Sequence, residues 1–105
     1  MDTFEKMVKD GDEGIRLNPK DAKAYYTRAM GYGCLGNSQQ SIEDFTVSIT
    51  LSPTWNAYHA RGYEYWKVGA RQKAIDDFRK GLEYDKDHEG LKTSLQQALA
   101  GTLMC

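Results

Sequence analysis

The chain has 105 residues, of which 40% are hydrophobic and 28% charged, and its formal net charge is −1. This length suits one domain rather than two, and the near-zero charge excludes the basic surface that nucleic acid or an anionic membrane would need. No apolar run approaches the roughly 18 residues of a membrane-spanning helix, and the charged start lacks the apolar stretch of a secretory signal.

The two cysteines, Cys34 and Cys105, exclude two further kinds of site. They are too far apart for a zinc motif, and two thiols do not make a disulfide framework. We therefore expect a cytoplasmic protein with reduced thiols and with no metal or cofactor. A bridge between two chains through Cys105 is an open alternative.

The first segment, residues 1–19, predicts one helix that ends before Pro19. One face of that helix carries Phe4, Met7 and Val8, which have helical spacing. Gly11 lies inside the helix. An interior glycine costs up to about 1 kcal/mol relative to alanine, so we expect a kink or fraying at this position.

Five more helices follow, separated by short glycine or proline turns. Their expected bounds are Asp21–Leu35, Ser38–Leu51, 55–68, 70–84 and 89–102. The residues expected to cap their N-termini are Asp21, Ser38, Thr54 and Asp87. No stretch alternates at period two for long enough to predict a strand. We expect the apolar end, Leu103 to Cys105, to be frayed.

A repeat with a period of 33 residues organises the middle of the chain. Its first copy consists of Tyr25, Arg28, Ala29, Tyr32, Gly36, Ser41, Ile42, Asp44 and Phe45, and its second of Tyr58, Arg61, Gly62, Tyr65, Gly69, Ala74, Ile75, Asp77 and Phe78. Such a period indicates stacked helical hairpins. The small residues allow paired helices to approach closely, and the aromatic residues fill the space between hairpins.

This pattern of large, small and aromatic positions resembles the tetratricopeptide repeat over nearly the whole chain. The resemblance implies an all-α, right-handed α-solenoid of antiparallel helix pairs that binds protein and is not an enzyme. It divides a single domain, residues 1–105, into a half-repeat helix (1–21), two full repeats (22–54 and 55–87) and a C-terminal capping helix (88–105).

Arg28 and Arg61 depart from the repeat pattern, which often has leucine at their position. A guanidinium in a packed interface needs a partner. We expect each arginine to bond an aspartate of its own or the preceding second helix, and Asp10, Asp44 and Asp77 share the required register. The alternative is a solvated arginine whose aliphatic stem lies along the surface.

The resemblance also implies that the first helix of each repeat lines a concave groove for a peptide or partner helix. The expected groove residues are Lys23, Tyr26, Met30, Cys34, Asn56, His59, Tyr63, Trp66 and Lys67. Aromatic and methionine side chains offer contact area at low entropic cost, which favours binding there. The alternative is self-assembly through exposed ends of the array, by Phe4, Met7, Val8, Leu91, Leu95 and Leu99.

Some members of the family clamp the C-terminal carboxylate of a chaperone tail with lysine, arginine and asparagine side chains. The matching positions here hold Tyr26, Met30, Ala60, Gly90 and Ser94. None of these supplies a cation or an amide, so we do not expect Hsp70 or Hsp90 tails to bind by that route.

Catalysis finds little support in the sequence. His59 and His88 are the only histidines, and neither has a histidine or cysteine at metal-ligand spacing. Cys34 could meet His59 across adjacent first helices, but no orienting acid or oxyanion donor accompanies that pair. We therefore expect no enzyme.

Overall fold

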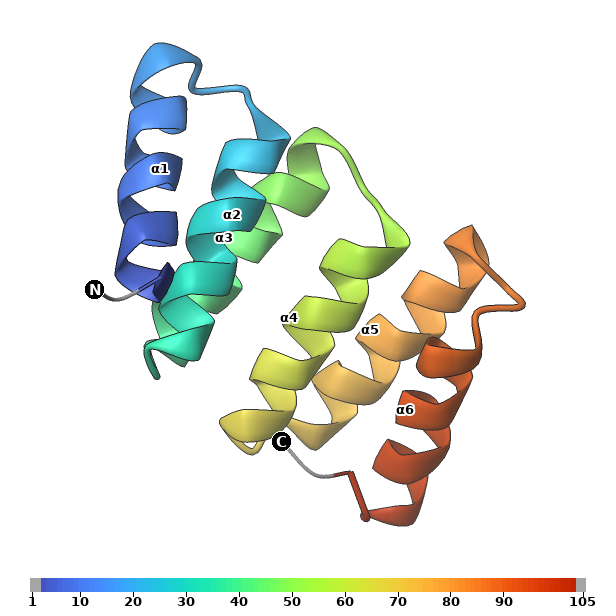
Figure 1. Ribbon diagram of the computed structural model, residues 1–105. Coiled ribbons are helices and arrows are strands. Elements are labelled where there is room, and N and C mark those ends of the chain that lie inside the picture. Colours follow the sequence, from blue (N-terminus) through green and yellow to red (C-terminus); the bar gives the residue numbers. More distant parts are fainter. Residues whose placement is uncertain (1–2, 104–105) are drawn as a thin grey trace. The chain divides into compact units, whose positions relative to one another are not determined.

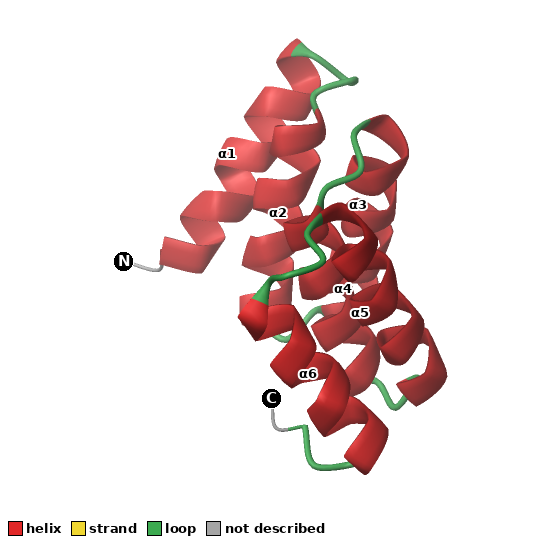
Figure 2. Ribbon diagram, turned by 90° about the vertical axis from the view of Figure 1, so that its right-hand side faces the viewer, coloured by secondary structure: helices red, strands yellow, loops and turns green. Residues whose placement is uncertain are grey.

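The computed structural model describes residues 3–103, and its contacts group the chain into two compact units, residues 1–53 and 54–105. The first unit contains α1 (Thr3–Leu17), α2 (Ala22–Cys34) and α3 (Ser38–Leu51); the second contains α4 (Trp55–Lys67), α5 (Arg71–Tyr84) and α6 (Glu89–Ala100) (Figure 1). The described residues form helices and loops without any strand (Figure 2), so the all-α prediction is confirmed. Within residues 3–103, no helix has the length and apolarity to cross a bilayer.

Two of the four predicted N-caps are confirmed and two are wrong. Asp21 accepts hydrogen bonds from the backbone of α2, and the Thr54 hydroxyl accepts one from the backbone of α4. Ser38 is instead the first residue of α3, behind an Asn37 cap that makes no side-chain bond. His88, not Asp87, caps α6, because its ring Nδ1 accepts the Leu91 N–H at 3.1 Å.

The predicted kink at Gly11 is wrong, since α1 runs unbroken from Thr3 to Leu17. Gly11 is buried against α2, and a Cβ at this position would lie 2.5 Å from the Cβ of Arg28 and 3.0 Å from the carbonyl oxygen of Ala24. The missing side chain therefore allows α1 to approach α2 closely, and this packing offsets the low helix propensity of glycine.

Small residues let the helices of each hairpin pack tightly, as the repeat predicts. In the first unit, the Ser41 hydroxyl donates to the Ala29 carbonyl at 2.7 Å, which joins α3 to α2. In the second unit, a Cβ on Gly62 would lie 2.6 Å from the ring of Phe78, which is fully buried. The phenylalanine ring thus occupies the space that the glycine leaves.

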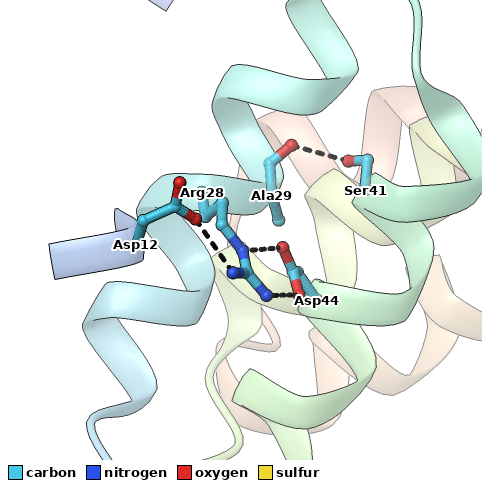
Figure 3. Close-up of polar contacts among 5 residues, drawn as sticks. All are labelled: Asp12, Arg28, Ala29, Ser41 and Asp44. Carbon is cyan, nitrogen blue, oxygen red and sulfur yellow. Dashed lines mark hydrogen bonds and ion pairs between the residues drawn. The ribbon is translucent and has the colours of Figure 1, made fainter. Parts of the chain in front are cut away.

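Each repeat arginine joins the first helix of its hairpin to the second. The Arg28 guanidinium donates to both carboxylate oxygens of Asp44, at 2.7 and 2.9 Å, and to Asp12 of α1 at 3.0 Å (Figure 3). Arg61 donates to both oxygens of Asp77, each at 2.8 Å. The ion-pair hypothesis is therefore confirmed, and the solvated alternative is wrong.

The acid on α1 is not the expected one. Asp10 pairs with Lys6 on the surface of α1, at 3.0 Å, while Asp12 reaches Arg28. Asp10 and Asp12 are two residues apart and therefore point about 200° apart around the helix, so only one of these two acids can face α2.

The two pairs lie in different electrostatic surroundings. The hydrogen bond to Asp44 raises the pKa of Arg28. Burial by itself would lower the pKa of Arg61, and the hydrogen bond to Asp77 turns this into a net rise. Burial raises the pKa of the Asp77 carboxyl, and the bonds from Arg61 oppose that rise only in part. The second pair therefore carries the larger desolvation cost.

The expected fraying of the C-terminal end is wrong for Leu103. Its side chain is 6% exposed and belongs to the hydrophobic core of the second unit. Gly101, with φ 76°, turns the chain back after α6. Met104 and Cys105, and with Cys105 the open alternative of a bridge between chains, lie outside the described residues.

We predict that Asp77→Asn lowers the free energy of unfolding by about 2 kcal/mol, because it removes the negative charge to which the Arg61 guanidinium donates two hydrogen bonds. Urea denaturation followed by circular dichroism measures the change. Asp76→Asn is the matched control, since Asp76 is exposed and accepts a hydrogen bond from the exposed Gln72 side chain. Equal losses in the two variants would contradict the prediction.

Candidate peptide-binding surfaces

The predicted groove residues of the first unit lie on one stripe of α2. Lys23, Tyr26, Met30 and Cys34 are three or four residues apart, so they share a helical face. Lys23 and Cys34 are exposed, the thiol of Cys34 is free, and Tyr26 and Met30 are half-buried. The ring of Tyr26 also packs edge-on against Phe45 of α3, with 5.5 Å between ring centroids.

The other two faces of α2 hold the neighbouring helices of the first unit. Ala24, Arg28 and Gly31 face α1, where Gly11, Gly14 and Val8 approach them. Ala22 and Ala29 face α3 and accept hydrogen bonds from its serine hydroxyls. At 100° a residue, these two faces are about 145° apart on one side of the helix and about 215° apart on the other, and the stripe from Lys23 to Cys34 lies in the wider arc.

The equivalent stripe of α4 is engaged inside the second unit. The Ser94 hydroxyl of α6 lies 2.9 Å from His59 Nε2 and 3.1 Å from the hydroxyl of Tyr63. The indole nitrogen of Trp66 donates to the backbone carbonyl of Leu103 at 3.0 Å. Three of the predicted groove residues therefore hold α6 and the residues after it.

Two predicted polar residues of α4 make local bonds. The Asn56 side-chain oxygen accepts from the Ala57 N–H at 3.1 Å. Lys67 pairs with Glu64, one turn earlier, at 2.8 Å. Both side chains thus have a partner on their own helix, and a ligand that used them would compete with it.

A histidine and aromatic cluster fixes the start of α6 on α4. The His88 ring packs against Trp55 at a tilt of 38°, with 4.0 Å between centroids, and lies 6.2 Å from the His59 ring. Burial lowers the pKa of His59, and the nearby His88 lowers it further. The imidazole of His59 is therefore held neutral and acts as a hydrogen-bonding group. Among residues 3–103, no three candidate metal ligands come together.

The apolar ends expected to carry self-assembly differ in exposure. Leu91 is 0% exposed and forms part of the core, and Leu95 packs against that core. The expectation that Leu91 is exposed is therefore wrong. Leu99 (47%) and Phe4 (40%) are exposed, while Met7 and Val8 are half-buried.

The structural roles of three residues were not predicted from the sequence: His88, Ser94 and Leu103. Histidine is not among the usual N-cap residues, and Ser94 occupies a position where only cations or amides were sought. The burial of Leu103 could have been predicted, because an apolar residue just after a C-terminal glycine often packs back on its helix.

The fold, built from antiparallel helical hairpins, defines a class of helical repeat proteins. Residues 56–88 match the tetratricopeptide repeat family model. The chain is 31% identical over 97 residues to Hsp70-Hsp90 organizing protein 1 of Glycine max and 33% identical over 95 residues to Hsp70-Hsp90 organizing protein 2 of Arabidopsis thaliana. These matches cover 91% and 86% of this chain but 17% of each relative.

Solved structures agree with this assignment. The Arabidopsis OM64 TPR domain superposes with a TM-score of 0.88 at 25% identity, covering 93% of this chain and 82% of that domain. The first TPR of Spaghetti (RPAP3), bound to the HSP90 peptide SRMEEVD, superposes with a TM-score of 0.89 at 17% identity, covering 93% of this chain and 79% of that one. The chain belongs to the tetratricopeptide repeat family, whose members are protein-interaction modules.

We predict that the free energy of unfolding falls as the pH drops from 7.5 to 5. The unfolded chain binds a proton on His59 near the ordinary pKa of 6.5, whereas the folded chain resists it until a lower pH. The contribution of His59 to stability is therefore complete above pH 6.5 and is lost below it, by at most about 1.4 kcal/mol per pH unit.

Urea denaturation at a series of pH values measures this loss. His59→Gln is the matched variant, because it keeps a hydrogen-bonding head group beside Ser94 and removes the titration. Its pH dependence should be flatter than that of the unmodified chain. Identical slopes would show that His59 does not contribute.

Proposed function

We propose that the chain binds a peptide or a partner helix through the α2 stripe, defined as Lys23, Tyr26, Met30 and Cys34. The observation that carries the proposal is the arrangement around α2. Within the first unit, α1 and α3 take two faces of this helix, and the stripe occupies the face between them. Because the printed contacts of α1 and α3 lie on other faces of α2, we propose that a ligand packs against this one.

The side chains of the stripe indicate the kind of ligand. Tyr26 and Met30 are half-exposed, large and apolar over most of their surface, so they would hold apolar anchor residues. Lys23 at one end adds a positive charge that favours an acidic flank. We therefore propose a ligand with spaced apolar side chains and at least one nearby acidic residue.

Selection of random peptides by phage display on the purified chain tests this proposal. A selected peptide should bind Tyr26→Ala or Met30→Ala at least tenfold more weakly, a loss of about 1.4 kcal/mol for each anchor. Tyr84→Ala is the control, because Tyr84 is an exposed aromatic residue of α5 outside the stripe. Equal binding by all variants, or no enriched peptide, would reject the proposal.

We further propose that the chain does not clamp a terminal carboxylate. Of the clamp positions, Met30 is half-buried, and the Ser94 hydroxyl already bonds His59 and Tyr63. The peptide SRMEEVD, which is bound to the RPAP3 domain, is the appropriate probe. Calorimetry should give the same weak or absent binding for this peptide and for its C-terminally amidated form. Tight binding that amidation abolishes would contradict us.

Self-assembly through the apolar ends is the alternative function. Exposed Phe4 on α1 and exposed Leu99 on α6 favour it, and buried Leu91 counts against it. A molar mass that rises with concentration in light scattering, and returns to one chain in Phe4→Ser, would favour assembly over the α2 stripe. The proposal also includes a cytoplasmic setting, where the exposed Cys34 thiol stays reduced.

A further inference from the structure

Three helices carry an aspartate at the same register of the repeat: Asp10 on α1, Asp44 on α3 and Asp77 on α5. The residues three before and four after each aspartate share its helical face. The three resulting stripes are Met7, Asp10 and Gly14 on α1, Ser41, Asp44 and Ser48 on α3, and Ala74, Asp77 and Gly81 on α5.

On α3 and α5, this stripe holds the first helix of the hairpin. The two serines of the α3 stripe donate to backbone carbonyls of α2, and both oxygens of Asp44 accept from Arg28 (Figure 3). On α5, both oxygens of Asp77 accept from Arg61 of α4. The Asp44 and Asp77 side chains are therefore only 8% and 7% exposed.

The stripe of α1 receives no arginine from residues 3–103. Its helix packs against α2 through a neighbouring face, where Val8 and Gly11 meet that helix. Asp10 points about 100° away from Gly11, and its side chain is 58% exposed. Its carboxylate bonds Lys6 of the same helix instead, in an exposed pair of a kind that contributes little stability.

We propose that the stripe of α1 docks a helix of a separate protein, and that an arginine of this helix forms a bidentate ion pair with Asp10. The two hairpins of the chain indicate the chemistry of that helix. In both, a tyrosine stands three residues before the arginine and another four residues after it, and a small residue follows the arginine directly. In a second copy of the chain, Arg28 and Arg61 already bind their own aspartates, so we assign the helix to another protein.

An arginine at Asp10 has a geometric advantage over Lys6. The lysine makes one bond, at 3.0 Å, whereas a guanidinium binds both carboxylate oxygens at once, as Arg28 does at Asp44. The Lys6 side chain is 62% exposed, so its ammonium remains hydrated when it is displaced. The site lies on α1 and thus goes beyond the function proposed for the α2 stripe.

A synthetic peptide with the sequence of residues 54–69 provides the probe, because it contains the tyrosine and arginine pattern of α4. In this peptide, a glutamate and a lysine joined by a lactam replace His59 and Tyr63, which lie on the side of the helix opposite Arg61. The lactam keeps the peptide helical, since helices of this length are marginal in water. A second peptide differs from the first by Arg61→Gln alone.

Nitrogen–proton correlation NMR on the full chain measures binding and locates it. The arginine peptide should shift the amide signals of Met7 and Asp10. Asp10→Asn should weaken its binding by at least about tenfold, and the glutamine peptide should bind the unmodified chain as weakly. Combining the two changes should cause no further loss, because both remove the same ion pair. Lys6→Gln should strengthen binding, because it removes the competitor for Asp10.

Glu5→Gln is the matched control, because Glu5 is an exposed acid of α1 that points about 140° away from Asp10. It should leave binding of the arginine peptide unchanged. Circular dichroism should show the same helix content in both variants, since both replace exposed side chains.

Three results would overturn the inference: equal binding of the two peptides, equal losses in Asp10→Asn and Glu5→Gln, or signal shifts confined to α5, where the peptide would have replaced α4. Failure of the proposed function has a different signature. It would appear as unchanged binding of selected peptides in the Tyr26 and Met30 variants, which leave the stripe of α1 intact.

Discussion

The rest of the structure depends on a bidentate ion pair in each hairpin. It joins an arginine of the first helix to an aspartate of the second helix. The Asp44 and Asp77 side chains are 8% and 7% exposed, so each pair has given up most of its hydration. An ion pair of this kind gains little over apolar residues of the same volume, but loss of one partner leaves a costly buried charge. Other alignments of the two helices would separate the arginine from the aspartate. They are therefore destabilised by more free energy than the intact pair contributes to the observed alignment.

The surroundings of the two arginines follow from that constraint. Each guanidinium lies between two tyrosine rings of its own helix, at 5.8 Å from both Tyr25 and Tyr32 in the first unit and at 5.6 and 5.5 Å in the second. The rings stand one turn before and one turn after the arginine, so they shield it from water and supply cation–π attraction. This explains why tyrosine, arginine and aspartate recur together with the period of 33 residues.

The sequence predicted those parts of the fold that depend on local spacing or on repetition. The helix bounds, the Asp21 and Thr54 caps and the arginine–aspartate pairs follow from helical periodicity and from the duplicated register. The kink at Gly11 was wrongly expected because propensity was considered without the close approach of Arg28.

The use of the candidate site residues was harder to predict. A stripe of aromatic residues at lining positions looks the same in the sequence whether it faces a ligand or another helix. His59, Tyr63 and Trp66 contact Ser94 and Leu103, which lie 31 to 37 residues later, and no local sequence pattern predicts such distant contacts.

The two lining stripes therefore differ in what a ligand would have to overcome. On α2, binding would use a face that the helices of the first unit leave available, and its cost would consist mainly of ordering the half-exposed Tyr26 and Met30 side chains. On α4, the same positions already satisfy hydrogen bonds and bury apolar surface with α6 and Leu103. A ligand there must replace interactions of equal quality, because an indole or hydroxyl left buried without a partner is itself destabilising. The repeat thus provides equivalent positions in both units, and in the second unit Ser94 of α6 and Leu103 engage those positions.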